Sequence, residues 1–392
     1  MKRAVVAALL VVSMVCGLWG AAAAQKPVLV GASLSLSGKY AKGAEFQNQA
    51  YQLWVEQVNA RGGLLGRPVE LRIYDDRSDP ATGVRLYEKL ISEDRVDLLV
   101  GPYSSAVTAA VSTVSEKHRR AMVAPMAAAN DIWQRGYRYV FQVITPASLY
   151  FIGGIELAAG AGLKHVAVTG EDSDYPRDAL PAAARRATEL GLQVTDLGYY
   201  PKGTKDFSAI ITRAKTVGAA VLVCGCYEPD AIQLIRQAKE LDYSAKMYVF
   251  GVGPALPEFA KALGKDAEFV MGSDHWDPRV KTPGNAEFVA AFQRKFGREP
   301  NYHAAGSYGG MQVLEAALKR AGSLDQDKIR QELVQLDIAT IFGRYKVTDA
   351  GAQTGKSAFI IQWQGRKKEI VWPPDAASAR AVIPAPAWSE RR

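Results

Sequence analysis

Cysteine, histidine and long apolar runs are scarce in this sequence. Its 392 residues include 3 cysteines and 4 histidines, too few for a disulfide-built miniprotein and unfavourable for a metal site of His and Cys ligands. Beyond residue 24, no stretch approaches the length of about 20 apolar residues that a membrane-spanning helix needs. The catalytic and nucleotide-binding signatures H-E-x-x-H, G-x-S-x-G and G-x-G-x-x-G are also absent. These absences leave no positive sign of an enzyme.

The rest of the composition is that of an ordinary globular protein, with 48% hydrophobic and 22% charged residues. This balance excludes a disordered chain and a collagen-like repeat. The formal charge of +8 suggests an acidic partner such as nucleic acid or anionic lipid. However, the basic residues are spread along the chain, and short clusters such as 366–368 do not form the aromatic-basic stripe of a single-strand-binding surface. We therefore predict no nucleic-acid partner.

The first 24 residues have the pattern of an export signal. Lys2 and Arg3 precede an apolar run over residues 4–15, and small residues lead to Ala-Ala-Ala at 22–24, as in a cleaved secretory signal peptide. A lipoprotein anchored through Cys16 is disfavoured by the bulky valine before it. We predict that residues 1–24 are removed, that the protein is located in the periplasm, and that the remaining chain forms two domains.

Strand and helix patterns alternate along most of the chain. Short β-branched and apolar runs predict strands, and apolar residues spaced three and four apart predict helices between them. A first set has strands at 28–34, 69–74, 96–100 and 121–124 and helices at 45–59, 81–93 and 105–117. A second set has strands at 139–143, 165–169, 193–197, 220–224 and 246–251 and helices at 148–161, 177–190, 208–217 and 229–241. Helices between successive strands indicate parallel sheets covered on both faces, so we predict two doubly wound α/β lobes.

The chain beyond residue 278 follows a different pattern. Helices are predicted at 286–296, 304–321 and 327–336, and strands at 345–347, 358–363 and 369–372. These pieces are too few to fold alone, so we expect them to return to the two lobes. Residues 376–392, rich in Ala, Pro and Arg, are expected to form a loose tail.

Three local motifs have chemical interpretations that other features of the sequence argue against. The P-loop-like run at 351–357 has one residue too few between its glycines and leads into a strand. The Asp-His-Trp-Asp run at 274–277 contains acid/base side chains, but it is better explained as a loop between lobes. Cys224 and Cys226 lie two residues apart in a strand, where a bridge between them would be strained, so we expect two free buried thiols.

The turns after the predicted strands are the remaining candidates for a site, because ligands of open parallel sheets lie outside the carboxyl ends of the strands. The turn at 101–105 opens a helix, where Ser104 or Ser105 is suited to cap the first amides. The same amides, hydroxyl and positive helix end are suited to a carboxylate, and the sequence leaves both interpretations open. Four of these turns carry a tyrosine, which combines apolar area with a hydroxyl group: Tyr40, Tyr103, Tyr175 and Tyr227.

Several motifs, in order along the chain, carry a family resemblance. They are Asn-Ala-Arg-Gly-Gly and a further glycine within 59–66, Tyr-Asp-Asp and Asp-Pro within 74–80, Gly-Pro-Tyr-Ser-Ser at 101–105, Asp-Phe-Ser at 206–208 and Tyr-Glu-Pro-Asp at 227–230. In this combination the chain resembles the type I periplasmic solute-binding proteins of the leucine/isoleucine/valine-binding family. The resemblance covers nearly all of the chain beyond residue 24.

The resemblance implies two α/β lobes joined by three crossover segments, with a ligand cleft between them. Lobe one would comprise 27–144 and 278–340, and lobe two 145–277 and 341–375. The implied function is that of a monomeric binding protein without catalysis, cofactor or metal, which delivers a small-molecule solute to an ABC permease/ATPase complex in the inner membrane. A ligand-sensing regulator on the same fold and an α/β enzyme are the alternatives. The export signal argues against the first and the missing catalytic motifs against the second.

The resemblance also assigns site residues by position. Ser105, with Ser104 beside it, matches the serine that holds the ligand carboxylate. His303 matches a residue on the side-chain pocket, although a surface histidine at a helix start is the alternative. The other matching positions lie around the ligand: Tyr40, Tyr103, Met126, Ala127, Ala128, Tyr175, Tyr227 and Gly253.

Two departures from the family pattern bear on the ligand. Ala128 stands where amino-acid binders have a Thr or Ser for the carboxylate, and Gly253 stands where they have an acid for the ammonium group. Glu258 is a helical turn away and is expected to point elsewhere. A buried ammonium without a counter-ion costs roughly several kcal/mol. We therefore expect a small carboxylate-bearing solute, and an aromatic or branched carboxylic acid, or an amide, fits better than a hydrophobic or branched-chain amino acid. Glu228 or Asp230 would restore the amino acid if either reached the cleft.

Overall fold

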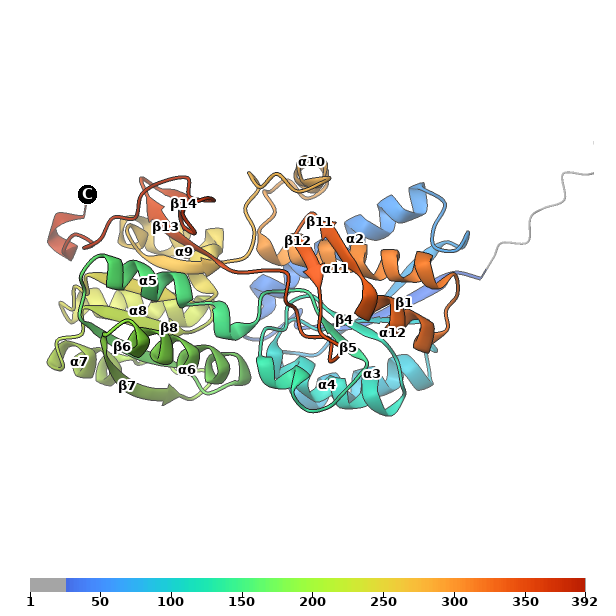
Figure 1. The fold of residues 1–392 in the computed structure, drawn as a ribbon, viewed down its shortest axis with the longest axis horizontal. Helices are drawn as coiled ribbons and strands as arrows, with labels where there is room; N and C mark the ends of the chain where they lie inside the picture. Colours follow the sequence, from blue (N-terminus) through green and yellow to red (C-terminus); the bar gives the residue numbers. More distant parts are fainter. Residues whose placement is uncertain (1–25, 392) are drawn as a thin grey trace, which may run out of the picture.

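A five-stranded parallel sheet forms the centre of lobe one in the computed structural model, which describes residues 26–391 (Figure 1). In the spatial order β2-β1-β3-β4-β5, its strands are β1 (Val28–Leu34), β2 (Val69–Asp75), β3 (Leu98–Val100), β4 (Met122–Ala124) and β5 (Val140–Gln142). All neighbouring strands are parallel, as predicted. Helix α3 (Pro80–Ser92) packs with α4 (Ser105–Lys117) on one face of the sheet. Helix α2 (Ala41–Ala60) covers the other.

A seven-stranded sheet forms the centre of lobe two, in the order β14-β13-β10-β9-β8-β6-β7. Its parallel strands are β6 (His165–Glu171), β7 (Gln193–Tyr200), β8 (Val221–Gly225), β9 (Met247–Phe250) and β10 (Met271–Asp274). Two antiparallel strands, β13 (Phe359–Gln364) and β14 (Lys367–Trp372), extend one edge. The helices around this sheet are α5 (Ile152–Gly160), α6 (Asp174–Glu189), α7 (Ser208–Thr216), α8 (Glu228–Glu240) and α9 (Pro257–Leu263). The predicted pair of doubly wound lobes is confirmed, with a mixed edge on the second sheet.

The C-terminal part of the chain returns first to lobe one. Helices α10 (Asn285–Phe296) and α11 (Tyr302–Ala321) pack on α2, and α12 (Gln326–Gln335) packs on α11. Strands β11 (Asp337–Thr340) and β12 (Gly343–Lys346) then form a separate antiparallel hairpin beside α11. The predicted start of lobe two at residue 341 is therefore wrong, because β12 pairs with β11 and not with the second sheet.

Three segments connect the lobes, at 143–151, 275–284 and 354–358, and each joins an element of one lobe to an element of the other. Gln353, just before the third segment, is still bound to lobe one. Its backbone N–H donates to Gln142 Oε1 at 3.1 Å, and its Nε2 donates to the Val143 carbonyl at 3.0 Å. The Asp-His-Trp-Asp run predicted to be a loop between lobes begins at the end of β10 and enters the second connection.

The C-terminal segment is held on lobe two, so the expectation of a loose tail at 376–392 is wrong for the described residues. The Trp388 side chain is only 8% exposed, and its Nε1 donates to the Tyr243 carbonyl at 3.0 Å. The Ala385 amide donates to the Lys246 carbonyl at 2.8 Å. The Ala-, Pro- and Arg-rich composition predicted a loose tail, but the buried indole and further hydrogen bonds hold the segment on lobe two.

Side-chain caps fix the helix starts that border the cleft. The Ser104 hydroxyl accepts the Val107 amide at 3.2 Å at the start of α4. The Asn301 side chain accepts the amides of His303 and Ala304 at 3.0 and 3.2 Å at the start of α11. Both caps satisfy amides that a helix start leaves free. They also set the direction in which the first residues of each helix point.

The described chain contains no helix that is long and apolar enough to cross a membrane. The predicted export signal at residues 1–24, with Cys16, lies outside the described residues.

Candidate ligand-binding cleft

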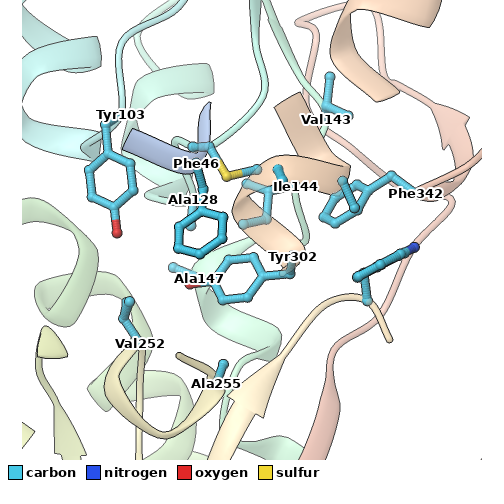
Figure 2. Packing of buried hydrophobic residues seen from close by; sticks show 14 of the residues in the cluster. Phe46, Tyr103, Ala128, Val143, Ile144, Ala147, Val252, Ala255, Tyr302 and Phe342 are labelled. Atoms are coloured by element: carbon cyan, nitrogen blue, oxygen red, sulfur yellow. The ribbon is translucent and has the colours of Figure 1, made fainter. Parts of the chain in front are cut away.

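A narrow cavity lies between the lobes, and side chains of both lobes and of the first connection line it. Its volume is about 20 Å³, roughly the space of one water molecule. Any larger ligand therefore needs the lobes to separate or the side chains to move. Figure 2 shows Tyr103, Ala128 and Tyr302 of lobe one opposite Val252 of lobe two. The lining residues are Tyr103, Ser104, Ser105, Met126, Ala128, Ile144, Tyr150, Tyr175, Tyr227, Val252, Tyr302 and His303.

The two serines at the start of α4 have different roles in the structure. Ser104 caps the helix, as described above. The Ser105 hydroxyl oxygen accepts the backbone amides of Ala128 and Ala129 at 3.0 and 3.1 Å. Because both bonds use the oxygen as acceptor, the hydroxyl proton remains available as a donor to a carboxylate. The positive end of α4 adds to the attraction for an anion at this point.

Three of the four predicted tyrosines, Tyr103, Tyr175 and Tyr227, line the cavity. Tyr40 lies behind them: its ring centroid is 4.6 Å from that of Tyr227 and 5.8 Å from that of Tyr103. The Tyr40 hydroxyl donates to Glu171 Oε1 at 3.4 Å. Burial and the Glu171 carboxylate raise the pKa of Tyr40, so this phenol is a neutral donor. Tyr40 supports the cavity wall without lining it.

His303 is buried in the cleft, 1% exposed, so the alternative of a surface histidine is wrong. Its Nε2 lies 2.9 Å from the Tyr103 hydroxyl, and the two rings stack at 5.2 Å. Burial, with a smaller contribution from the Lys368 charge, lowers the pKa of His303 to about 3. The ring is therefore neutral at physiological pH. Its Nδ1 has no hydrogen-bond partner among residues 26–391.

The backbone positions assigned by resemblance divide into two groups. Met126 and Ala128 line the cavity. Ala127 is buried on another side of its strand end, where its carbonyl accepts Gln142 Nε2 at 3.2 Å. Gly253 packs against α8, since a Cβ at this position would lie 2.5 Å from the Ala231 Cβ, and the preceding Val252 lines the cavity in its place.

Sequence reasoning missed four lining residues: Ile144, Tyr150, Val252 and Tyr302. Tyr302 and Val252 each adjoin a residue that was assigned, so their positions carried a usable signal. Tyr150 fell inside the predicted helix 148–161, but α5 begins only at residue 152. The turn before it carries Tyr150 into the cleft.

A second neutral histidine lies directly behind these aromatic rings. The His275 ring is 4.3 Å from that of Tyr150 and 4.9 Å from that of Tyr302. Burial lowers the pKa of His275 well below its usual value. Neither ring nitrogen has a hydrogen-bond partner within the described part of the chain.

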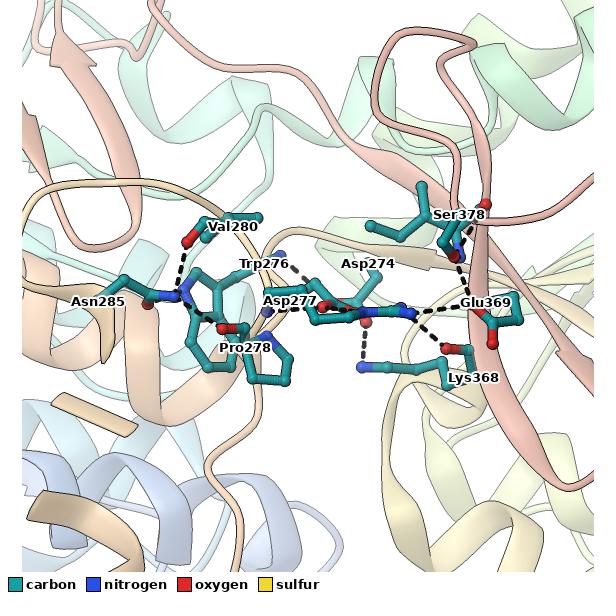
Figure 3. A network of polar contacts seen from close by, with 11 residues as sticks. Asp274, Trp276, Asp277, Pro278, Val280, Asn285, Lys368, Glu369 and Ser378 are labelled. Carbon is teal, nitrogen blue, oxygen red and sulfur yellow. Dashed lines mark hydrogen bonds and ion pairs between the residues drawn. The ribbon is translucent and has the colours of Figure 1, made fainter. Parts of the chain in front are cut away.

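The connection that carries His275 is fixed by a polar network (Figure 3). Lys368 Nζ lies 2.5 Å from Asp274 Oδ2, and Arg279 bridges Asp277 and Glu369 at 2.7 and 3.0 Å. The network ties the second connection to strand β14 of lobe two. Its polar partners support the interpretation of residues 274–277 as a loop between lobes.

No acidic residue is among the cavity-lining residues of the described chain. Asp230 accepts Lys39 Nζ at 2.7 Å and the Tyr200 hydroxyl at 3.3 Å. Glu228 and Glu258 do not line the cavity either. The cavity is therefore rich in hydroxyl groups and has neither a formal negative charge nor a formal positive one.

Cys224 and Cys226 are free and buried, as predicted. The Cys224 sulfur lies 3.7 Å from the Tyr200 hydroxyl, and neither cysteine is among the cavity-lining residues of the described chain.

Comparison with known proteins gives a consistent picture. A family model described as "Periplasmic binding protein" matches residues 27–368. A relative named Leu/Ile/Val-binding protein homolog 7 from Brucella suis is 28% identical over 396 aligned positions, which cover 96% of this chain and 99% of the relative.

Two solved structures are similar to the chain in fold. A leucine-binding protein from Thermotoga maritima superposes with a TM-score of 0.82 at 24% identity, covering 89% of this chain and 99% of that one. A solute-binding protein of an ABC transporter from Rhodopseudomonas palustris, in complex with benzoate, superposes with a TM-score of 0.78 at 19% identity, covering 91% and 98%.

Proposed function

Because the chain belongs to the periplasmic binding protein family, we propose that it is the solute-binding component of a branched-chain-amino-acid-type ABC importer. In this proposal residues 1–24 direct export and are removed, and the protein acts as a periplasmic monomer. It catalyses no reaction, needs no cofactor, and passes its solute to a permease/ATPase complex in the inner membrane. The observation that carries the proposal is the hydroxyl-lined cavity between two lobes, with Ser105 at the positive end of α4.

The ligand in this proposal is a small aromatic or branched carboxylic acid, or a related amide, without an ammonium group. Its carboxylate would accept the Ser105 hydroxyl proton and benefit from the α4 helix end. An α-amino acid would also bring an ammonium group, and the cavity lining offers it no carboxylate. Burying that charge unpaired costs several kcal/mol. The two structurally similar proteins represent the two ligand classes under comparison: one is a leucine-binding protein, and the other was solved with the amine-free acid benzoate.

Binding would occur by closure of the lobes. A cavity of about 20 Å³ has room for about one water molecule. The ligand therefore enters when the lobes separate, and the side chains that line the cavity move aside as the lobes close on it. Ligand contacts with both lobes then shift the equilibrium towards closure.

Isothermal titration calorimetry with matched ligand pairs tests the proposal. Leucine and 4-methylpentanoate share a side chain and a carboxylate and differ in the ammonium group, as do phenylalanine and 3-phenylpropanoate. Benzoate and benzamide extend the series to ligands without a flexible chain. We expect the amine-free acid to bind more tightly in each pair. Tight binding of leucine with no binding of the acids would contradict the proposed ligand class.

A further inference from the structure

Four charged side chains from both lobes meet beside Tyr40. We call Lys39, Glu171, Lys202 and Asp230 the interlobe charge cluster. Lys39, in the turn between β1 and α2, binds both carboxylates of lobe two: it contacts Glu171, and its Nζ lies 2.7 Å from Asp230 Oδ2. In the opposite direction, Lys202 of lobe two donates to the Ser78 carbonyl of lobe one at 2.7 Å, with its Nζ 4.6 Å from the Tyr40 ring centroid.

The central ion pairs of this cluster are buried. The side chains of Lys39, Glu171 and Asp230 are 11%, 0% and 4% exposed. Burial works against the Lys39 charge, but the two carboxylates outweigh it and raise the pKa of Lys39. Burial raises the pKa of Asp230, and Lys39 partly counteracts this. Among residues 26–391, the ion pairs of both acids of lobe two are with this one lysine of lobe one.

This pairing matters only when the lobes are closed. When they separate, both carboxylates and the lysine regain water, so the open form does not require the pair. In the closed form, removal of the lysine would leave two carboxylates buried without their partner, which is far more costly than the absence of the whole group. The same substitution thus penalises one state of the protein and not the other.

We propose that Lys39 is a closure-controlling residue, which sets the balance between open and closed forms, and thereby ligand affinity, without touching the ligand. This inference rests on the proposed function, in which binding occurs by lobe closure. Lys39 does not line the cavity; it lies one layer outward, with its Nζ 5.8 Å from the Tyr227 ring centroid. The apparent affinity of a protein whose binding-competent form is only partly populated falls in proportion to that population.

The test uses the full mature chain labelled for single-molecule FRET at two exposed positions, Glu93→Cys on lobe one and Glu240→Cys on lobe two. The native cysteines are buried. In this background, Lys39→Met keeps the length and apolar stem of the side chain and removes the charge. Lys205→Met is the matched control, since Lys205 is an exposed lysine of lobe two that forms no ion pair within residues 26–391.

We expect Lys39→Met to lower the closed-to-open ratio of the ligand-free protein by about tenfold or more and Lys205→Met to leave it unchanged. Adding Glu171→Gln and Asp230→Asn to Lys39→Met removes the two carboxylates that have lost their lysine. This triple variant should regain the closed-to-open ratio of the unsubstituted protein. A merely structural role of Lys39 within lobe one would not produce this rescue.

Equal closed fractions for Lys39→Met and Lys205→Met would overturn the inference. This includes the case in which both variants are mostly open to the same extent. A loss of closure that the two acid substitutions do not reverse would overturn it as well. Because the FRET measurement needs no ligand, it is independent of the calorimetry. Failure of the proposed ligand class and failure of the closure role are therefore distinguishable.

Discussion

The cavity between the lobes and the interlobe charge cluster lie a few ångströms apart and are built from opposite chemistry. The cavity is lined by hydroxyl groups, aromatic rings and a neutral histidine. The cluster next to it consists of two lysines and two carboxylates. Tyr40 separates the two regions, with its ring against Tyr103 and Tyr227 and its hydroxyl on Glu171.

The cavity and the interlobe charge cluster therefore have different proposed roles. In the proposed function, the neutral interior recognises the ligand by hydrogen bonds and shape, and it disfavours an added ammonium because the lining has no group to neutralise it. The interlobe charge cluster does not contact the ligand in this proposal, but it couples the two lobes to each other. Substitutions in the two regions should therefore change different measurable quantities.

The largest expected effect is the loss of stability at low pH, which arises from the buried histidines next to the cavity. The pKa of His303 is about 3 in the folded protein, whereas an unfolded histidine titrates near pH 6.5. Below about pH 6.5 the unfolded chain binds a proton that the folded chain does not, so the free energy of unfolding falls as pH falls from about 6.5 towards 3. The loss is about 1.4 kcal/mol per pH unit for each such histidine, and His275 adds to it in the same direction.

Urea unfolding at about pH 7 and about pH 5 measures this effect. His303→Asn should lose clearly less stability on acidification than the unsubstituted protein. Equal losses for the two proteins would mean that the interior histidine is not held neutral by burial.

Replacement of the serine that faces the ligand should have the next largest effect. We expect Ser105→Ala to weaken binding of an amine-free acid by about 10- to 100-fold, because it removes a hydrogen bond to a charged group. Ser104→Ala is the comparison variant, which removes the α4 cap and about 1 kcal/mol of stability. Because Ser104 also lines the cavity, we expect some loss of affinity, but a smaller one than for Ser105→Ala. Calorimetry and urea unfolding of both variants separate the two roles, and equal losses of affinity would contradict them.

The smallest predicted effect concerns the hydrogen bond between Tyr103 and His303. Tyr103→Phe leaves the stacked rings in place and removes the hydroxyl 2.9 Å from Nε2. We expect a loss of about 1 kcal/mol in the free energy of unfolding and a change in affinity of only a few-fold. A loss of affinity as large as that of Ser105→Ala would show that Tyr103 is the main ligand contact.

The layered architecture was predictable from local patterns, and the exceptions have different causes. Apolar runs separated by helical periodicity identified most strands of both sheets. Strand β10 was missed because its sequence, Met-Gly-Ser-Asp, lacks the β-branched residues typical of strands. The lobe boundary was misplaced because strand β11 was not predicted, and β12 forms a short local hairpin with it. The C-terminal segment was misjudged because its docking depends on contacts with distant residues such as Tyr243.

The site was predictable to the extent that it depends on strand ends. The turns after strands placed Tyr103, Ser105 and Tyr227 in the cavity wall, and the family resemblance added His303. Tyr150 comes from a connection between lobes, whose path depends on the lobes being packed together. The interlobe charge cluster was invisible to sequence reasoning for the same reason, since Lys39 and Asp230 are far apart in the chain and meet only when both lobes are folded.

The proposed ligand of the cleft is a small carboxylic acid that lacks an ammonium group. The most direct test of this proposal is the identity of the molecule that co-purifies with the protein from its native host, released by denaturation and identified by mass spectrometry. We predict a small amine-free aromatic or branched acid, or a related amide, in a one-to-one ratio with the protein. Leucine or another α-amino acid in that position would contradict the account.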